Sequence, residues 1–215
     1  MLHRSIGQGV SFRMRIFNPD GSEAEMCGNG ARCAALFACA GRLAGKQMAF
    51  QTLAGNIRAS VTENKVKIKM EEPRGTELNK EIIVKGKKLK VHHMDTGVPH
   101  TILIYKHIDR LDISALSPPV RFHSAFPRGT NVDYVQLINR HRIKMRTYER
   151  GVENETLACG TGAVASAILS ALLGYTAGPV EIIVPGGMLK VYFKLAPVRD
   201  VSLEGEAKIV YRGEV

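Results

Sequence analysis

The 215-residue sequence predicts an α+β protein made of two similar lobes, each a β-sheet wrapped around a central helix, with a shortened first lobe. The first observation is a repeated glycine turn. Cys27 begins Cys-Gly-Asn-Gly-Ala, and Cys159 begins Cys-Gly-Thr-Gly-Ala, 159 − 27 = 132 residues later. The second is that the same offset pairs residues 52–59 with residues 184–191, apolar on apolar and basic on basic. A constant offset over separated segments indicates a duplicated unit, in which each cysteine occupies the same place.

The first copy is predicted to run strand, turn, helix, strand. Residues 13–17 alternate as in a short strand, and residues 18–21 (Asn-Pro-Asp-Gly) have the composition of a turn. Residues 31–43 contain alanines and large apolar side chains, and predict a helix that ends at a glycine. Residues 61–70 alternate between apolar and polar and predict a second strand.

The second copy repeats this order. We expect a strand over residues 142–148, a turn over 151–154, a helix over 163–173, and strands over 180–184 and 188–195. The helix is almost wholly apolar, and a helix that is apolar on every side is buried. It is therefore predicted to lie at the centre of its lobe.

The two copies differ in length. Residues 101–105 and 131–135 are also predicted strands, but subtracting 132 from 101 gives −31, so these strands have no counterpart in the first copy. The first lobe is expected to lack about 40 residues that the second possesses. We expect the first lobe to span residues 1–89 and the second 90–199, with a strand pair in 200–215 returning to pack on the first lobe.

Composition limits the classes of function. No apolar run approaches the ~20 residues of a membrane span, and the start lacks the apolar stretch of a signal peptide, so a cytoplasmic protein is expected. The net charge of +10 is dispersed, and its densest patch, residues 80–90, alternates with apolar residues like an exposed strand. Neither a membrane nor a nucleic acid is therefore the expected partner. Besides the two repeated cysteines, Cys33 and Cys39 lie on the first helix and are predicted to be small core residues.

A cysteine followed by Gly-X-Gly at a helix start has a specific chemistry. The first N–H groups of a helix have no intrahelical partner and carry partial positive charge, so a thiol there is converted more readily to thiolate. The glycines let a ligand approach the backbone, whose N–H groups can hold a carboxylate. Two such turns facing each other across a cleft suggest that one thiol removes a proton from a carbon and the other returns a proton to the opposite face.

That reaction is racemisation or epimerisation at a carbon next to a carboxylate. The helix ends would stabilise the developing negative charge, so no pyridoxal phosphate is required. Neither turn has a phosphate-binding pattern, and no metal site or other cofactor is expected. Arg150 suits a bidentate grip on a carboxylate, although a surface ion pair is the simpler alternative. Asn131 suits an amino group or merely an Asx turn, and His100 either relays protons to a thiol or is simply hydrogen-bonded.

Three segments resemble the diaminopimelate epimerase family. Residues 15–33 (RIFNPDGSEAEMCGNGARC) resemble its first signature, and residues 126–132 (FPRGTNV) and 149–163 (ERG through CGTGA) resemble its later ones. The resemblance implies two similar lobes and a cofactor-independent two-base interconversion of LL- and meso-diaminopimelate, in lysine and peptidoglycan synthesis. It also implies a homodimer.

The resemblance implies a role for each matching residue. Cys27 and Cys159 are the acid/base pair, with His100 and Glu149 supporting proton transfer. The residues implied in substrate binding are Asn18, Gly28, Asn29, Asn131, Glu149, Arg150, Gly160 and Thr161.

The sequence departs from the family's pattern at two places, which keep other functions open. Val98 stands where many members have a substrate-binding asparagine, and the family's Gly-Asn-Asp-Phe opening signature is absent. One alternative is a racemase or epimerase with another amino acid substrate, such as histidine or proline. Another is a shortened homologue that binds substrate without catalysis.

Overall fold

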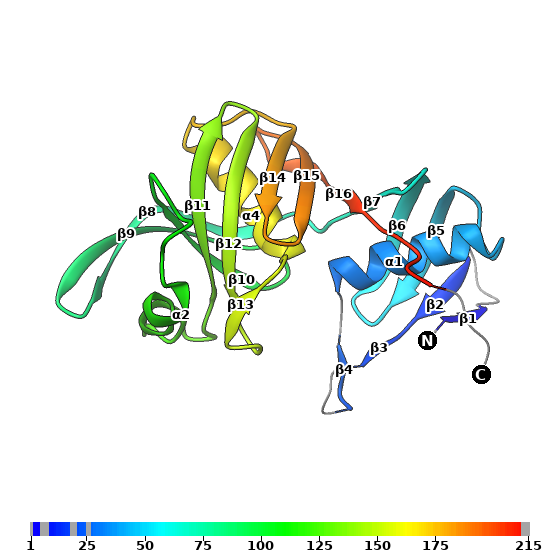
Figure 1. The fold of residues 1–215 in the computed structure, drawn as a ribbon, viewed down its shortest axis with the longest axis horizontal. Coiled ribbons are helices and arrows are strands. Elements are labelled where there is room, and N and C mark those ends of the chain that lie inside the picture. Colours follow the sequence, from blue (N-terminus) through cyan, green and yellow to red (C-terminus); the bar gives the residue numbers. More distant parts are fainter. Residues whose placement is uncertain (1, 5–8, 18–20, 25–26, 212–215) are drawn as a thin grey trace. The chain divides into compact units, whose positions relative to one another are not determined.

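The computed structural model describes residues 2–4, 9–17, 21–24 and 27–211, which form two compact units (Figure 1). The first unit comprises residues 1–70 and 202–215, and the second comprises residues 71–201. The boundary expected after residue 89 thus lies after residue 70 in this division, because residues 74–84 form a strand that pairs with the sheet of the second unit.

The first unit is a mostly antiparallel sheet with one long helix. Its strands are β1 (Leu2–Arg4), β2 (Phe12–Met14), β5 (Gln47–Thr52), β6 (Gly55–Thr62), β7 (Lys65–Lys69) and the end of β16 (Arg199–Glu206), in that spatial order. Among the strands that the structure describes in this unit, only β2 and β5 pair in parallel. A small separate ladder joins β3 (Ile16–Phe17) to β4 (Glu23–Ala24), and helix α1 spans Gly28–Ala40.

Period-two alternation builds the core of the first unit. Phe50 on β5, Val61 on β6 and Ile68 on β7 are all buried, while their sequence neighbours are more exposed. The rings of Phe12 and Phe50 stack with centroids 4.8 Å apart, which ties the parallel pair β2–β5 together. Helix α1 packs mainly on β6 and β7.

The second unit is a larger mixed sheet around an apolar helix. Its strands run in the order β15 (Gly187–Lys194), β14 (Val180–Val184), β12 (Arg142–Glu149), β11 (Asn131–Asn139), β10 (Pro99–Ile104), β9 (Lys87–Asp95) and β8 (Arg74–Val84). The short strand β13 (Asn154–Thr156) pairs with β12. The helices are α2 (Ile113–Leu116), α3 (Pro118–Arg121) and α4 (Gly160–Leu172). The pairs β10–β11 and β12–β14 are parallel.

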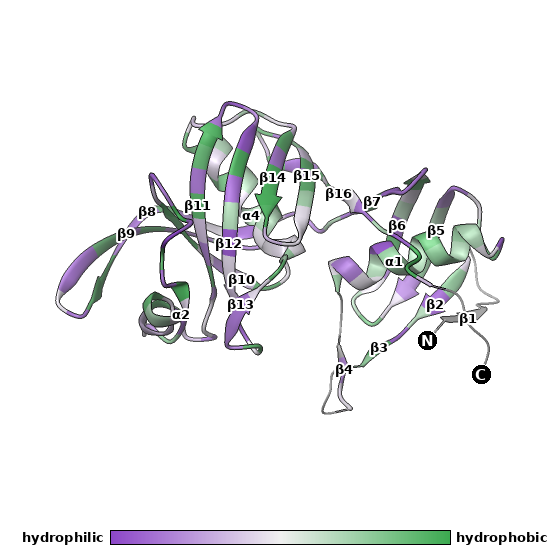
Figure 2. Cartoon of the chain, in the orientation of Figure 1, coloured by the Kyte–Doolittle hydropathy of each residue, from purple (hydrophilic) through white to green (hydrophobic). Residues whose placement is uncertain are grey.

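Helix α4 is buried on all sides, as its composition predicts. Residues 162–171 are all buried, and the helix packs against β9 to β12, β14 and β15. Figure 2 shows the alternating hydrophilic and hydrophobic bands of the strands of this unit. A second cluster, which includes Ile108, Ile113, Phe126 and Tyr134, anchors the segment that leads into β11.

The two helices differ in how much of their surface is covered. Phe37 on α1 is 56% exposed, whereas its counterpart on α4, Leu169, is fully buried. Cys33 is likewise exposed, so the prediction that it is a core residue is wrong, and Cys39 is half-buried. The cause is tertiary: β9 to β12 cover α4, and α1 has no corresponding cover within the described residues.

Four other local predictions need correction. Residues 13–17 do not form one strand, because β2 ends at Met14 and β3 belongs to the separate ladder with β4. Residues 61–70 do not form one strand, because a turn at Glu63, which has φ of 56°, separates β6 from β7. Residues 80–90 likewise fold as two strands around a turn at Lys85 and Gly86. Within 201–211 there is only the end of β16, whose residues 202–206 pair with β7 of the first unit. The turn predicted at residues 18–21 lies mostly outside the described residues.

Candidate active site

The two helices begin with the same backbone geometry. Cys27 caps α1 with φ −138° and ψ 115°, and Cys159 caps α4 with φ −120° and ψ 113°. Each cap carbonyl accepts the first helical hydrogen bond, from Ala31 N at 2.8 Å and from Ala163 N at 3.0 Å. Because both N-cap residues are extended, each cysteine side chain starts beside the first-turn N–H groups of its helix.

In the first unit, the sulfur of Cys27 is itself a helix cap. Gly30 N donates to Cys27 Sγ at 3.4 Å. Arg32, one turn further on, donates from Nη2 to Asn29 Oδ1 at 2.8 Å and from Nη1 to Gly28 O at 3.4 Å. Arg32 therefore fixes the Gly28-Asn29 turn that is predicted to bind substrate.

Arg32 also carries a buried positive charge next to this turn. It is only 6% exposed, and its Nε has no hydrogen-bond partner among the described residues. Burial lowers the pKa of Arg32, and the nearby thiols of Cys33 and Cys27 act in the opposite direction. A guanidinium nevertheless stays charged in proteins, so a cation lies near Cys27.

In the second unit, Cys159 lies at the end of a chain of hydrogen bonds. Its Sγ lies 3.4 Å from Thr161 Oγ1, and Thr161 Oγ1 lies 2.9 Å from His100 Nε2. His100 Nδ1 in turn lies 2.7 Å from Asp133 Oδ2. The hydroxyl of Thr161 thus links His100 to Cys159, and His100 is hydrogen-bonded on both ring nitrogens.

The pair of His100 and Asp133 is completely buried. Asp133 Oδ1 accepts a second hydrogen bond, from Thr147 Oγ1 at 2.7 Å. Burial alone would lower the pKa of His100, but the carboxylate of Asp133 and the nearby Cys159 outweigh it and raise the pKa to about 10. His100 is therefore an imidazolium at neutral pH, with Nδ1–H donating to Asp133 and Nε2–H to Thr161.

This pair predicts that the protein loses stability at alkaline pH. The folded state keeps a proton on His100 up to a pH of about 10, whereas the unfolded state releases it near the ordinary value of 6.5. Below pH 6.5 the contribution is complete, and between these values the free energy of unfolding falls as the pH rises. Denaturant midpoints measured at several pH values should fall more steeply for the wild type than for His100→Gln. Equal slopes would contradict the assignment.

The residues predicted to grip the distal end of a substrate form a second group in this unit. Asn131, at the start of β11, accepts from Arg150 N at 2.8 Å and donates to Pro99 O at 2.9 Å. Arg150 donates from Nη1 to Arg128 O at 3.1 Å, and Glu149, beside it at the end of β12, is half-buried. The amide of Asn131 thus joins the strand ends that carry Arg150 and His100, which is more than an Asx turn.

Sequence reasoning missed a residue that holds two of these loops. Arg121 is buried and donates to Glu153 Oε1 from Nη2 at 2.7 Å and from Nε at 3.2 Å. Its carbonyl accepts from Thr130 N at 3.3 Å. Gly129 has φ of 63°, and a Cβ there would overlap the guanidinium of Arg121. Arg121 therefore connects the loop before Asn131 to the turn after Arg150.

The structure groups the predicted residues by unit. Cys27, Gly28 and Asn29 lie together in the first unit. In the second unit Cys159, Gly160, Thr161 and His100 form one group, and Asn131, Glu149 and Arg150 form the other. Asn18 lies outside the described residues. Asp133 is the further residue that sequence reasoning missed, although its place two residues after Asn131 on a strand puts both on the same face.

No group of three histidine, cysteine or acidic side chains in the part of the chain that the structure describes could hold a metal ion. Among those residues, no helix has both the length and the apolar character needed to cross a membrane.

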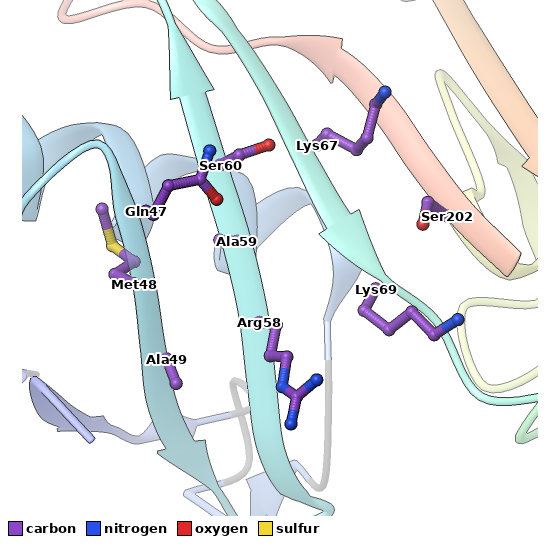
Figure 3. A pocket seen from close by; sticks show the side chains of 9 residues that line it. All are labelled: Gln47, Met48, Ala49, Arg58, Ala59, Ser60, Lys67, Lys69 and Ser202. Atoms are coloured by element: carbon purple, nitrogen blue, oxygen red, sulfur yellow. The ribbon is translucent and has the colours of Figure 1, made fainter. Parts of the chain in front are cut away.

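A pocket of about 480 Å³ lies in the first unit. Its lining comes from β5, β6, β7 and β16 and includes Arg58, Lys67 and Lys69 (Figure 3). It contains none of the residues predicted to act in catalysis. Its basic side chains belong to the exposed side of the sheet, and Lys67 lies 3.6 Å from Glu204.

A family model and the relatives in sequence both indicate the same family. The model of the family described as diaminopimelate epimerase matches residues 6–75 and 93–210. A diaminopimelate epimerase of Aquifex aeolicus is 42% identical over 208 residues, which cover 95% of this chain and 74% of that protein. One of Methanocella arvoryzae is 39% identical over 220 residues, covering 96% of this chain and 77% of that protein.

Solved structures with this fold are more distant in sequence. A probable proline racemase from Agrobacterium radiobacter superposes with a TM-score of 0.72 at 15% identity, covering 95% of this chain and 72% of that one. A hydroxyproline epimerase from Agrobacterium vitis gives 0.70 at 14% identity, covering 95% and 70%. At such identities the likeness confirms the α+β fold class alone. The family model and the relatives in sequence go further, and on their evidence the chain belongs to the diaminopimelate epimerase family.

Proposed function

We propose that this protein is an isomerase that interconverts LL- and meso-diaminopimelate without a cofactor, as a step in lysine biosynthesis. The observation that carries the proposal is the pair of cysteine-capped helix starts within a chain of this family. Identity of 42% over 95% of the chain to a named diaminopimelate epimerase supports the substrate.

The proposed reaction moves one proton off the α-carbon and another onto it. The thiolate of one cysteine takes the proton, becoming a thiol, and the electron pair of the broken C–H bond passes into the substrate carboxylate. The thiol of the other cysteine then gives its proton to the opposite face of the carbon, and becomes a thiolate. Charge and atoms balance, and the free enzyme is left with its thiolate on the other cysteine. Both sulfurs must reach the same carbon for this to happen.

The helix ends are proposed to lower the barrier of this step. Negative charge grows on the substrate carboxylate as the proton leaves, and the first-turn N–H groups following Cys27 and Cys159 are oriented donors with partial positive charge. Such stabilisation acts on the transition state more than on the ground state, so it accelerates the reaction. Gly28 and Gly160 lack a Cβ, which lets a carboxylate approach these donors.

The other predicted residues are proposed to select the substrate. Arg150 provides a fork of donors that matches the distal carboxylate, and Glu149 beside it suits the distal ammonium group. We assign Asn131, Asn18 and Asn29 to substrate contacts on the strength of the family signatures that they match. We further propose a homodimer in the cytoplasm, which size-exclusion chromatography with light scattering and cell fractionation would test.

A substrate panel tests the proposed function. The purified protein should epimerise diaminopimelate and leave proline, hydroxyproline and histidine unchanged, because none of these carries a second amino acid end for Glu149 and Arg150. Chiral chromatography of each reaction gives the answer. Turnover of another amino acid in place of diaminopimelate would contradict the proposal, as would binding of diaminopimelate without turnover.

A further inference from the structure

We infer that the hydroxyl of Thr161 is the proton bridge between Cys159 and His100. Asp133 is the positioning residue that keeps Nε2 of His100 directed at this hydroxyl. The inference rests on the proposed function in one respect, the use of Cys159 as an acid and a base. Its geometry lies entirely within the second unit.

The bridge depends on a hydroxyl being both donor and acceptor. Thr161 Oγ1 lies between Cys159 Sγ, at 3.4 Å, and His100 Nε2, at 2.9 Å. When His100 is an imidazolium, Nε2–H donates to Oγ1, and the hydroxyl proton points to a thiolate. When His100 is neutral, the hydroxyl donates to Nε2 and accepts the S–H of a thiol. The two orientations stabilise opposite protonation states of Cys159.

Turning the hydroxyl round transfers a proton without moving a heavy atom. Starting from thiol and neutral imidazole, the S–H proton passes to Thr161 Oγ1 as the hydroxyl proton passes to His100 Nε2. The product is a thiolate and an imidazolium, with Thr161 unchanged. The reverse transfer restores the thiol. The thiolate and imidazolium are the forms expected at neutral pH, so His100 holds the proton that the reverse transfer returns to Cys159.

Asp133 sets the conditions for this exchange. Its Oδ2 accepts from His100 Nδ1 at 2.7 Å, so in either charge state the Nδ1 proton stays in place and Nε2 is the nitrogen that exchanges. Thr147 Oγ1 donates to Asp133 Oδ1 at 2.7 Å and orients the carboxylate. The titratable groups around the imidazole are Asp133 on β11, Cys159 at the start of α4 and His93 on β9.

The backbone of Thr161 is also held in place by hydrogen bonding and close packing. Thr96 Oγ1 donates to Thr161 O at 3.1 Å. Gly162, the next residue, lies so close to the pair that a Cβ would be 2.6 Å from Asp133 Oδ1. The first turn of α4 therefore packs directly against the imidazole and carboxylate.

Among the described residues of the first unit there is no equivalent bridge. At the 132-residue offset Thr161 corresponds to Asn29, whose side-chain oxygen accepts from Arg32. A carboxamide cannot accept and release a proton as a hydroxyl does. Arg32 itself corresponds to Val164. The two thiols thus have different neighbours. Cys27 lies near Arg32, a permanent cation, and Cys159 is linked to His100, whose charge can change.

The matched variants Thr161→Val and Thr161→Ser test the bridge. Valine keeps the shape and removes the hydroxyl, while serine keeps the hydroxyl. We expect kcat for epimerisation to fall roughly tenfold or more in Thr161→Val. This loss is smaller than the loss expected when an acid or base is removed altogether, because Cys159 itself remains. Thr161→Ser should retain most of the wild-type kcat, and KM should change by less than about threefold in both variants. Equal kcat values in the two variants would overturn the inference.

A second measurement reports the bridge without any turnover. Cys159 is kept and the other three cysteines are replaced by alanine, and the histidine ring nitrogens are followed by ¹⁵N NMR. The signals of His100 are assigned as those missing from the His100→Gln variant. Alkylating Cys159 with iodoacetamide removes its charge and should shift the titration of His100 Nε2 in the wild-type and Thr161→Ser backgrounds, and should shift it clearly less in Thr161→Val, where only the direct effect of Cys159 remains. A shift of equal size in all three proteins would overturn the inference.

The two measurements separate the inference from the proposed function. If no protein epimerises diaminopimelate, the proposed function fails, and the NMR result alone decides the bridge. If Thr161→Val does not fold, Thr161→Ala takes its place, because it also removes the hydroxyl and adds no atoms. Asp133→Asn should lower the pKa of His100 and lower kcat with it. Unchanged values of both would exclude Asp133 as the positioning residue.

Discussion

Replacing Cys159 or Cys27 with alanine is expected to lower kcat for epimerisation by roughly 10³-fold or more, near the upper end for a positioned acid or base. The reason is that inversion needs a proton donor on one face of the carbon and an acceptor on the other. Either variant retains only one of them. Chiral chromatography of diaminopimelate, started separately from the LL and the meso isomer, measures the loss.

Deuterium incorporation sharpens this test. A variant with one thiol left can still remove the α-proton from the isomer that its thiolate faces and return deuterium from solvent to the same face. We therefore expect Cys27→Ala and Cys159→Ala to label different isomers slowly, without inversion. Cys33→Ala is the matched control, because Cys33 is an exposed cysteine on the helix that Cys27 caps. Substantial epimerisation by either single-thiol variant would contradict the two-base mechanism.

The elements that could be predicted from the sequence are those set by local signals. Strand β14 was expected over residues 180–184 and spans Val180–Val184, because a short apolar run is bounded there by Gly-Pro and Pro-Gly-Gly. The starts of both helices follow from their glycine turns, although the helices begin three residues earlier than their apolar runs suggested. The turn at Glu63 was missed because its left-handed conformation is adopted by a residue that does not ordinarily mark a turn.

The relationship between His100 and Asp133 could not be predicted in this way. They are 33 residues apart and meet because β10 and β11 pair in parallel, with His100 opposite Asn131. No local pattern determines which residues two parallel strands bring together. The exposure of Cys33 has the same origin, since the residue lies on a helix and its burial depends on what packs over it. The sequence thus indicated the reactive groups, and the long-range pairing determined what supports them.

Replacing Gly162 with alanine is expected to lower both stability and activity, against the usual trend for a helix. In a helix interior, alanine is normally favoured over glycine by about 1 kcal/mol. Here the new Cβ would lie 2.6 Å from Asp133 Oδ1 and 3.1 Å from His100 Cε1. Both partners are fully buried, so neither can move away without breaking a hydrogen bond. We expect the free energy of unfolding to fall by roughly 1–3 kcal/mol, as in other overpacked cores.

The corresponding glycine of the other unit provides the control. A Cβ at Gly30 would lie 3.0 Å from Met14 Cε, the flexible end of a side chain that can rotate aside. Gly30→Ala should therefore change the free energy of unfolding by less than about 1 kcal/mol. Urea denaturation of both variants measures the difference, and the ¹⁵N resonances of His100 show whether its bond to Asp133 survives. If Gly162→Ala is as stable as Gly30→Ala, then the helix does not press on the buried pair. The contact that fixes Thr161 beside His100 would in that case have to come from elsewhere in the unit.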